Sequence, residues 1–288
     1  MEPKGSVINE ICSLYDQLSG GEQAIADFVM AHPSDIASMT TREIAQASAT
    51  SAASVSRFAR RLGYESLSAL RGALLRDERA YDEQGGLSVI SMDSPKAALE
   101  TVLMVKNREL TDTLSLLKED EVVRAVHLLE RSVSITFAAV GNTIPSALSA
   151  SFLMGQLGLR CNCAPTTEAM MLNSLSLTPR DVIVFLSKSG HSQRLNKMMD
   201  NAIDSDTPTI VITNQLGSPL ARRATCVLHA ATHDKMLSPD MPFSHNSINY
   251  IIEVLFLLLS SDIPNFRAQA GLLWKALGED KGVPGEVF

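Results

Sequence analysis

The stretch that most constrains the fold is the segment from Asp181 to Ser192, DVIVFLSKSGHS. Its apolar run, Val182 to Leu186, is typical of a strand that is buried on both faces, as in a parallel sheet. The strand passes directly into a serine-rich turn, and a polar run that predicts a helix follows. Such an arrangement can bind a phosphate group, because the first N–H groups of a helix have no intrahelical partner.

The residues of the turn support this interpretation. Gly190 allows the backbone to approach a ligand closely, and the hydroxyl groups of Ser187, Ser189 and Ser192 can donate hydrogen bonds to phosphate oxygens. The simpler alternative is an ordinary connection between a strand and a helix, in which Ser192 only caps the helix.

Composition limits the class of protein. A chain of 288 residues is long enough for two domains, and a net charge of −7 argues against a generally basic nucleic-acid binder while allowing a local basic face. The four cysteines have neither disulfide nor zinc spacing, and the N-terminus lacks the apolar core of a signal peptide. The longest apolar run, Ile248 to Leu259, is too short to span a bilayer. We expect a cytoplasmic protein that does not enter a membrane.

The first third of the chain, residues 1–80, has helical periodicity throughout. A helix that begins at Thr40 or Thr41 is followed by a short turn, and Ser51 caps the next helix. Two helices joined by a turn of this length predict a helix-turn-helix. One face of the second helix is apolar, with Val55 and Phe58. The opposite face is basic and carries Arg57, Arg60 and Arg61.

This basic face stands out because residues 1–80 together carry 8 Lys and Arg against 10 Asp and Glu, a net charge of −2. It predicts a helix that faces double-stranded DNA. Residues near the N-terminus of the helix would read base edges: Ser51, Ala52, Ala53, Ser54, Ser56 and Arg57. Arg60 and Arg61 would mostly contact phosphates. The alternative is a solvated basic face on a small helical domain.

The run TTREIAQASATSAASVSRFARRLGYESLSALRGAL resembles the helix-turn-helix of the RpiR family of bacterial transcriptional regulators. The family pattern is matched by Ile44-Ala45, Ser51, Val55, Arg57-Phe58 and the sequence from Arg60 to Tyr64. The resemblance covers residues 7–78. It implies that the chain regulates transcription by binding a DNA operator.

The rest of the chain predicts an α/β domain with a mainly parallel, doubly wound sheet, since strands alternate with helices. The predicted strands are 134–140, 159–163, 182–186, 209–213 and 225–229; the helices between them are 145–157, 166–175, 192–204 and a short 218–223. Polar groups follow three strands: Gly141-Asn142-Thr143, Ser187 to Ser192, and Thr213-Asn214. Ligands bind such sheets at the carboxyl ends of the strands. Because neither a GxGxxG nor a Walker motif is present, we do not expect a dinucleotide or nucleoside triphosphate. Loops with hydroxyl groups and Lys188 as their one lysine suit a phosphomonoester, and we expect no cofactor or metal.

This part resembles the sugar isomerase (SIS) domain over residues 96–262. The family's two signature turns correspond to Gly141-Asn142-Thr143 and to Ser187-Lys188-Ser189-Gly190-His191-Ser192. The chain departs from the pattern at Ala139, where glycine is common, and exchanges one hydroxyl residue for another at Thr143 and Ser192. The resemblance implies that Thr143, Ser187, Ser189 and Ser192 bind the phosphate, helped by N–H groups around Gly190 and His191.

The predicted organisation is a helix-turn-helix domain at 1–80, a linker at 81–95, a SIS domain at 96–278 and a tail at 279–288. We expect a regulator, not an enzyme, whose SIS domain senses a phosphorylated sugar and so changes operator binding. Long apolar helices at 239–260 and 264–277 predict a homo-oligomer, either a dimer or a tetramer. The alternative is a phosphosugar isomerase with a helical dimerisation head, whose base would come from Glu168, His191, His229, His233, His245 or Glu253. A sensor of a cell-wall amino sugar would differ only in its ligand.

Overall fold

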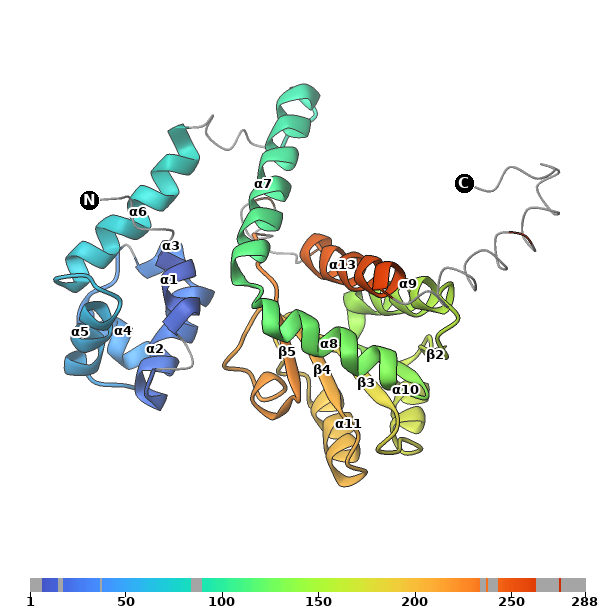
Figure 1. The fold of residues 1–288 in the computed structure, drawn as a ribbon. Coiled ribbons are helices and arrows are strands. Elements are labelled where there is room, and N and C mark those ends of the chain that lie inside the picture. The colour runs from blue at the N-terminus through green and yellow to red at the C-terminus, as the bar shows by residue number, and fades with distance from the viewer. Residues whose placement is uncertain are drawn as a thin grey trace. The chain divides into compact units, whose positions relative to one another are not determined.

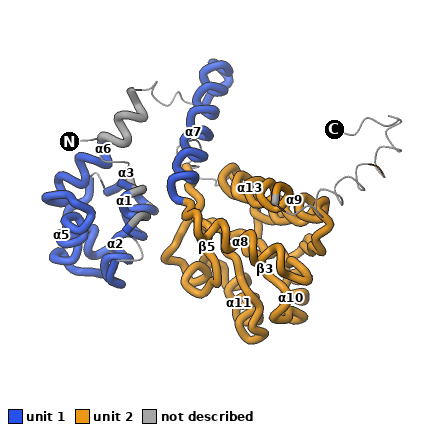
Figure 2. The backbone as a smooth tube through the Cα atoms, viewed as in Figure 1, with its two compact units in different colours: residues 1–116, 235–240 blue, residues 117–234, 241–288 orange. Residues whose placement is uncertain are grey.

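The computed structural model describes residues 7–14, 18–36, 38–83, 90–233, 237, 243–262 and 275. The chain forms two compact units, which are coloured separately in Figure 2. The first comprises residues 1–116 with 235–240, and the second comprises residues 117–234 with 241–288. This division places residues 96–116 with the N-terminal unit, although the sequence pattern assigns them to the second domain. The predicted domain limits therefore stay a prediction.

The first unit is helical in its described part. Its elements are α1 (Val7–Leu14), α2 (Gly20–Ala31), α3 (Pro33–Ile36), α4 (Thr41–Ala47), α5 (Ala52–Arg61), α6 (Leu67–Glu83) and α7 (Pro95–Leu116). A small core of Ile25, Ile44, Phe58 and Leu70, all fully buried, joins α2, α4, α5 and α6. Helix α4 begins where predicted because Thr40 and Glu43 cap its N-terminus reciprocally: the Glu43 N–H donates to Thr40 Oγ1 at 3.2 Å, and the Thr40 N–H donates to the Glu43 carboxylate at 2.6 Å.

The second unit contains a five-stranded sheet whose strands are all parallel (Figure 1). The strands are β1 (Ile135–Ala139), β2 (Cys161–Asn162), β3 (Val182–Leu186), β4 (Thr209–Thr213) and β5 (Cys226–His229), and their order is β2-β1-β3-β4-β5. Every residue of β1, β3 and β4 is buried. The predicted fold class, a helical head followed by a parallel α/β domain, is confirmed.

Helices cover both faces of the sheet, which is why its inner strands are apolar throughout. Residues of α8 (Glu119–Arg131), α9 (Ile144–Gly155) and α13 (Asn246–Asp262) form one core with β1, β3, β4 and β5. Residues of α10 (Thr167–Ser174) and α11 (Gln193–Asp204) form the core on the other face. Figure 1 shows these two groups of helices on either side of the strands.

Four elements differ from the predictions. The helix predicted at 239–260 corresponds to α13, which begins at Asn246. Strand β2 has only two residues, whereas five were predicted, and it lies at an edge of the sheet, where it pairs with β1 alone. The helix predicted at 218–223 is a single 3-10 turn, η3 (Ala221–Arg223). Helix α6 extends to Glu83, beyond the start of the predicted linker at 81–95. Most of the helix predicted at 264–277, residues 84–89 of the linker and the tail at 279–288 lie outside the described residues. Among the described helices, none is both long and apolar enough to cross a membrane.

Candidate functional site

The two predicted ligand loops leave the sheet side by side. Strands β1 and β3 are neighbours, and their register sets Ala139 opposite Leu186. The chain then continues into α9 on one face of the sheet and into α11 on the other. A pair of neighbouring parallel strands whose connections diverge in this way opens a crevice at their carboxyl ends, where ligands bind in doubly wound sheets. The structure therefore brings Gly141–Thr143 and Ser187–Ser192 to one edge.

The loop after β1 is a 3-10 turn, η2 (Gly141–Thr143). Gly141 has a φ of +56°, and both it and Asn142 are exposed. Thr143 is buried, and its hydroxyl donates to the Val140 carbonyl at 2.9 Å. In this structure that hydroxyl closes its own turn, so it can accept a hydrogen bond but has no hydrogen left for a phosphate.

The serines of the loop after β3 have the opposite arrangement, because each oxygen accepts a backbone N–H. Ser187 Oγ accepts from Gly190 at 3.1 Å, Ser189 Oγ from His191 at 3.3 Å, and Ser192 Oγ from Leu195 at 3.4 Å. None of the three hydroxyls donates its hydrogen to another described residue. Three hydroxyl hydrogens are thus available at one loop, as hydrogen bonding to an anion requires.

Two further features of this loop favour an anion. The first turn of α11 contains no acidic residue, so the positive end of the helix dipole is not neutralised there. The imidazole of His191 is held from one side, with Nδ1 2.5 Å from the Ser189 carbonyl oxygen. Since a carbonyl only accepts, Nδ1 carries the hydrogen, and the side chain is exposed. The ring can therefore present Nε2 to a ligand.

The sequence alone did not predict which residues hold the loop after β3 in place. Gly190 has a φ of +63°, and a Cβ added to it would lie 2.0 Å from Ser218 Oγ. Asn196 on α11 donates to the Ser192 carbonyl at 2.9 Å. The polar end of β4, Thr213-Asn214, was visible in the sequence as a group that follows a strand. Ser218 carries no such signal.

Helix α5 is the second helix of the predicted helix-turn-helix. Its N-cap is Ser51, whose Oγ accepts the Ser54 N–H at 3.1 Å. Val55, Phe58 and Ala59 are fully buried, whereas its three arginines, Arg57, Arg60 and Arg61, are exposed. Of the six predicted base-reading residues, four are exposed: Ser51, Ala52, Ala53 and Arg57. Two are half-buried: Ser54 and Ser56.

Two side chains of this unit have local roles in the structure. The hydroxyl of Ser56 donates to the Ala52 carbonyl at 3.1 Å, and the guanidinium of Arg57 donates to Ser54 Oγ at 3.2 Å. Arg71 is another arginine of residues 1–80, and its guanidinium donates to the Met39 carbonyl. Arg71 therefore fastens α6 to the segment before α4.

The groups that an isomerase would use as a base are scattered in the second unit. Glu168 at the start of α10 pairs with Arg194 on α11 at 3.5 Å, and both side chains are mostly exposed. Glu253 is exposed on α13. His229 is buried at the end of β5, where its Nε2 lies 3.2 Å from the Asn214 carbonyl oxygen and its Nδ1 has no hydrogen-bond partner.

Burial lowers the pKa of His229 from 6.5 to about 4. The unfolded chain therefore binds more protons than the folded one between these two values, so the stability falls as the pH falls from about 6.5 to about 4. Between about pH 7 and pH 5, the protein should lose about 2 kcal/mol of stability because of His229, and we expect His229→Gln not to show this loss. Urea unfolding of both proteins at the two pH values measures this, and equal pH dependence would contradict it.

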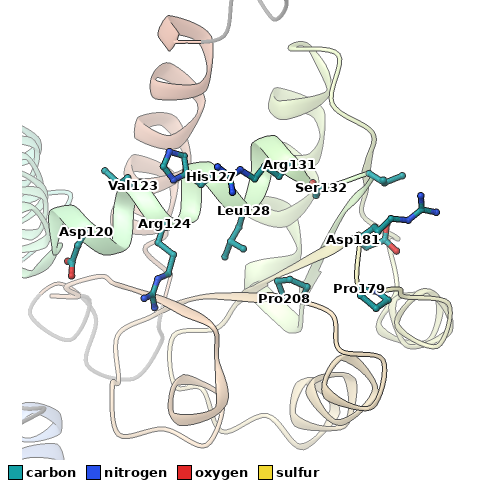
Figure 3. A pocket seen from close by; sticks show the side chains of 12 residues that line it. Asp120, Val123, Arg124, His127, Leu128, Arg131, Ser132, Pro179, Asp181 and Pro208 are labelled. Carbon is teal, nitrogen blue, oxygen red and sulfur yellow. The ribbon is translucent and has the colours of Figure 1, made fainter.

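A separate cleft of about 560 Å³ lies at the opposite edge of the sheet (Figure 3). One side of α8 and the segments that precede β1, β3 and β4 form its walls, with Leu128 and Pro208 among the apolar lining residues and Arg124 and Arg131 among the charged ones. It contains none of the predicted site residues. No group of three or more potential metal ligands occurs in the described part of the chain.

Two known domain families match parts of this chain. Residues 5–80 match the helix-turn-helix domain of the rpiR family, and residues 128–248 match the SIS domain. An uncharacterized HTH-type transcriptional regulator of Caldanaerobacter subterraneus subsp. tengcongensis is 24% identical over 259 residues, covering 88% of this chain and 89% of its own. A second, from Haemophilus influenzae, is 24% identical over 283 residues, covering 93% and 95%.

Two solved structures share the fold. The NanR protein of Vibrio vulnificus, complexed with ManNAc-6P, has a TM-score of 0.61 at 20% identity, covering 94% of this chain and 97% of NanR. The sugar isomerase domain of an RpiR transcription factor from Sphaerobacter thermophilus has a TM-score of 0.57 at 18% identity, covering 63% and 98%. The chain therefore combines a helix-turn-helix domain of the rpiR family with a SIS domain that follows it.

Proposed function

We propose that this protein is a DNA-binding transcriptional regulator whose SIS domain senses a phosphorylated sugar. The observation that carries the proposal is the loop after β3, where three serine hydroxyls accept backbone N–H groups and keep their own hydrogens to donate. The same chain carries a recognition helix with three exposed arginines. The likeness to NanR, which was solved with ManNAc-6P, supports a sugar phosphate as the effector class.

The effector site comprises Gly141, Asn142, Thr143, Ser187, Ser189, Gly190, His191 and Ser192. Ser187, Ser189 and Ser192 donate to phosphate oxygens, with the N-terminus of α11 adding the positive end of its dipole. Gly141 and Asn142 form the facing loop across the crevice. Thr143 fits this role once its hydroxyl turns away from the Val140 carbonyl, since a hydroxyl hydrogen rotates freely.

A homodimer would place two recognition helices on a palindromic operator. Support comes from the apolar surface of α9 and α13, two helices that pack against each other. Phe152 on α9 is 70% exposed and Leu257 on α13 is 60% exposed. Large apolar side chains this exposed are covered in many proteins by a second copy of the chain. We infer that the protein works in the cytoplasm, where its operator is.

We infer that the SIS domain binds its sugar phosphate without converting it. The curated relatives are named as transcriptional regulators, which supports this inference. The competing function is sugar-phosphate isomerisation, and His191 is the residue that favours it, since its exposed imidazole lies inside the phosphate loop. Conversion of a sugar phosphate that His191→Gln abolishes would establish the isomerase.

Arg57→Ala tests the DNA-binding half of the proposal. Removing a base contact should lower the operator affinity by a factor of roughly 5 to 100 and weaken the preference for one particular base pair of the operator. Fluorescence anisotropy with the operator and with single-base variants measures both effects. Arg180→Ala is the matched control, because it removes an exposed arginine from the second unit and should leave operator binding unchanged. Equal losses from both substitutions, or a uniform loss on all DNA sequences, would contradict base reading by Arg57.

A further inference from the structure

Thr213, the last residue of β4, and the segment that follows it, residues 214–220, are hydrogen-bonded to the loop that follows β3. The Asn214 N–H donates to the Lys188 carbonyl at 3.0 Å, and the Leu220 N–H donates to the Gly190 carbonyl at 3.3 Å. The Thr213 hydroxyl donates to the same Lys188 carbonyl at 3.1 Å. Two carbonyl groups of the loop are thus held toward this segment.

The direction of these carbonyls fixes the direction of the neighbouring N–H groups. In a trans peptide the C=O and the following N–H point to opposite sides of the chain. Since the carbonyls of Lys188 and Gly190 face the segment after β4, the N–H groups of Ser189 and His191 face away from it. The His191 N–H donates to Ser189 Oγ at 3.3 Å and the Gly190 N–H donates to Ser187 Oγ at 3.1 Å, so the Ser189 N–H, beside these two hydroxyls, can point to an anion.

Thr213 is the side chain at the centre of this arrangement. It is fully buried, and its hydroxyl both donates to Lys188 and accepts the Gln215 N–H at 3.2 Å. A Cβ added to Gly190 would lie 3.5 Å from Thr213 Oγ1, so the loop rests directly against this side chain. The hydroxyl thus connects the end of β4 to the back of the loop.

We propose that Thr213 is a positioning residue of the phosphosugar site, an inference that rests on the proposed function. It does not touch the ligand. Its hydroxyl fixes the Lys188 peptide, and the fixed peptide keeps the N–H of Ser189 and the hydroxyls beside it in the geometry that binds phosphate. Without the hydroxyl, the Lys188 peptide loses its side-chain partner and samples other orientations, which lowers the affinity for phosphate.

The test uses the full-length protein labelled with ¹⁵N-histidine and titrated with inorganic phosphate. The chain has six histidines, so the amide signal of His191 is readily followed and is assigned with His191→Gln. Thr213→Val removes the hydroxyl at nearly constant shape, and Thr213→Ser keeps it. Thr209→Val is the matched control, because Thr209 lies on the same strand, is 1% exposed and accepts the Thr225 N–H at 2.9 Å at the far end of the sheet.

We expect Thr213→Val to raise the phosphate Kd roughly fivefold or more, as for the loss of one hydrogen bond. Thr213→Ser and Thr209→Val should bind as the wild type does, although both valine variants lose thermal stability. Equal phosphate affinity in Thr213→Val and the wild type, or equal weakening by Thr209→Val, would overturn the positioning role. If the wild-type His191 signal does not respond to phosphate, the proposed site itself fails, and the positioning role fails with it.

Discussion

Replacing Gly190 by alanine is expected to abolish the response of the protein to its sugar phosphate. The added Cβ would lie 2.0 Å from Ser218 Oγ and 2.4 Å from Ser218 Cβ, and the backbone φ of +63° is strained for any L-residue. Left-handed strain and overpacking of a buried contact together cost roughly 2–4 kcal/mol. The loop can relieve this only by moving away from the segment after β4, which displaces the serines. Urea unfolding and phosphosugar titration of the operator complex measure the two effects.

Gly141→Ala is the matched control for the effect of this substitution on stability. Gly141 has a similar φ of +56°, but a Cβ there would meet no atom within 4 Å. It should lose only about 1–2 kcal/mol from backbone strain. Adding Ser218→Gly to Gly190→Ala removes the clashing side chain and should restore part of the stability. If Gly190→Ala behaves like Gly141→Ala, the contact with Ser218 does not hold the loop.

The double substitution Ser187→Ala with Ser189→Ala is expected to remove the ligand response and leave DNA binding intact. Each serine would donate one hydrogen bond to a charged phosphate, worth about 1.5–3 kcal/mol. Losing both should weaken the sugar phosphate by a factor of roughly 100 or more. The helix-turn-helix belongs to the other compact unit, so operator affinity without ligand should not change. Calorimetry with the sugar phosphate and anisotropy with the operator measure these two affinities.

Ser132→Ala with Ser205→Ala is a suitable control for the double substitution. Both hydroxyls donate to a local backbone carbonyl at 2.9 Å, Ser132 to Leu129 and Ser205 to Asn201. Neither residue belongs to the two loops, so this variant should keep the full ligand response. A ligand response that survives Ser187→Ala with Ser189→Ala would show that the phosphate binds elsewhere.

The sequence predicted the elements whose determinants are local. Strand β3 is recognisable from five consecutive apolar residues, because a strand covered on both faces needs no polar alternation. Helix α5 is recognisable from the Ser51 cap and from the separation of Phe58 and the arginines onto two faces. Strand β3 has the predicted limits, and helix α5 begins directly after its predicted cap, Ser51.

The parts that sequence reasoning missed depend on contacts between distant segments. Ser218 lies against Gly190 only because β3 and β4 are neighbours in the sheet. Residues 218–223 were predicted to be helical, but Leu220, just before η3, donates its N–H to the Gly190 carbonyl in the loop after β3. Arg71 donates to a carbonyl in the segment before α4, and no local pattern in the sequence reveals that contact.

The most direct test of the regulator hypothesis is a mobility-shift titration of the full-length protein on the DNA upstream of its own gene cluster. The binding is measured at several salt concentrations, with and without a panel of sugar phosphates that includes ManNAc-6P. The proposed function predicts a sequence-specific complex that one of these sugar phosphates dissolves or tightens. A protein that forms no specific complex under any of these conditions, and that converts one of the sugar phosphates into its isomer, would contradict it.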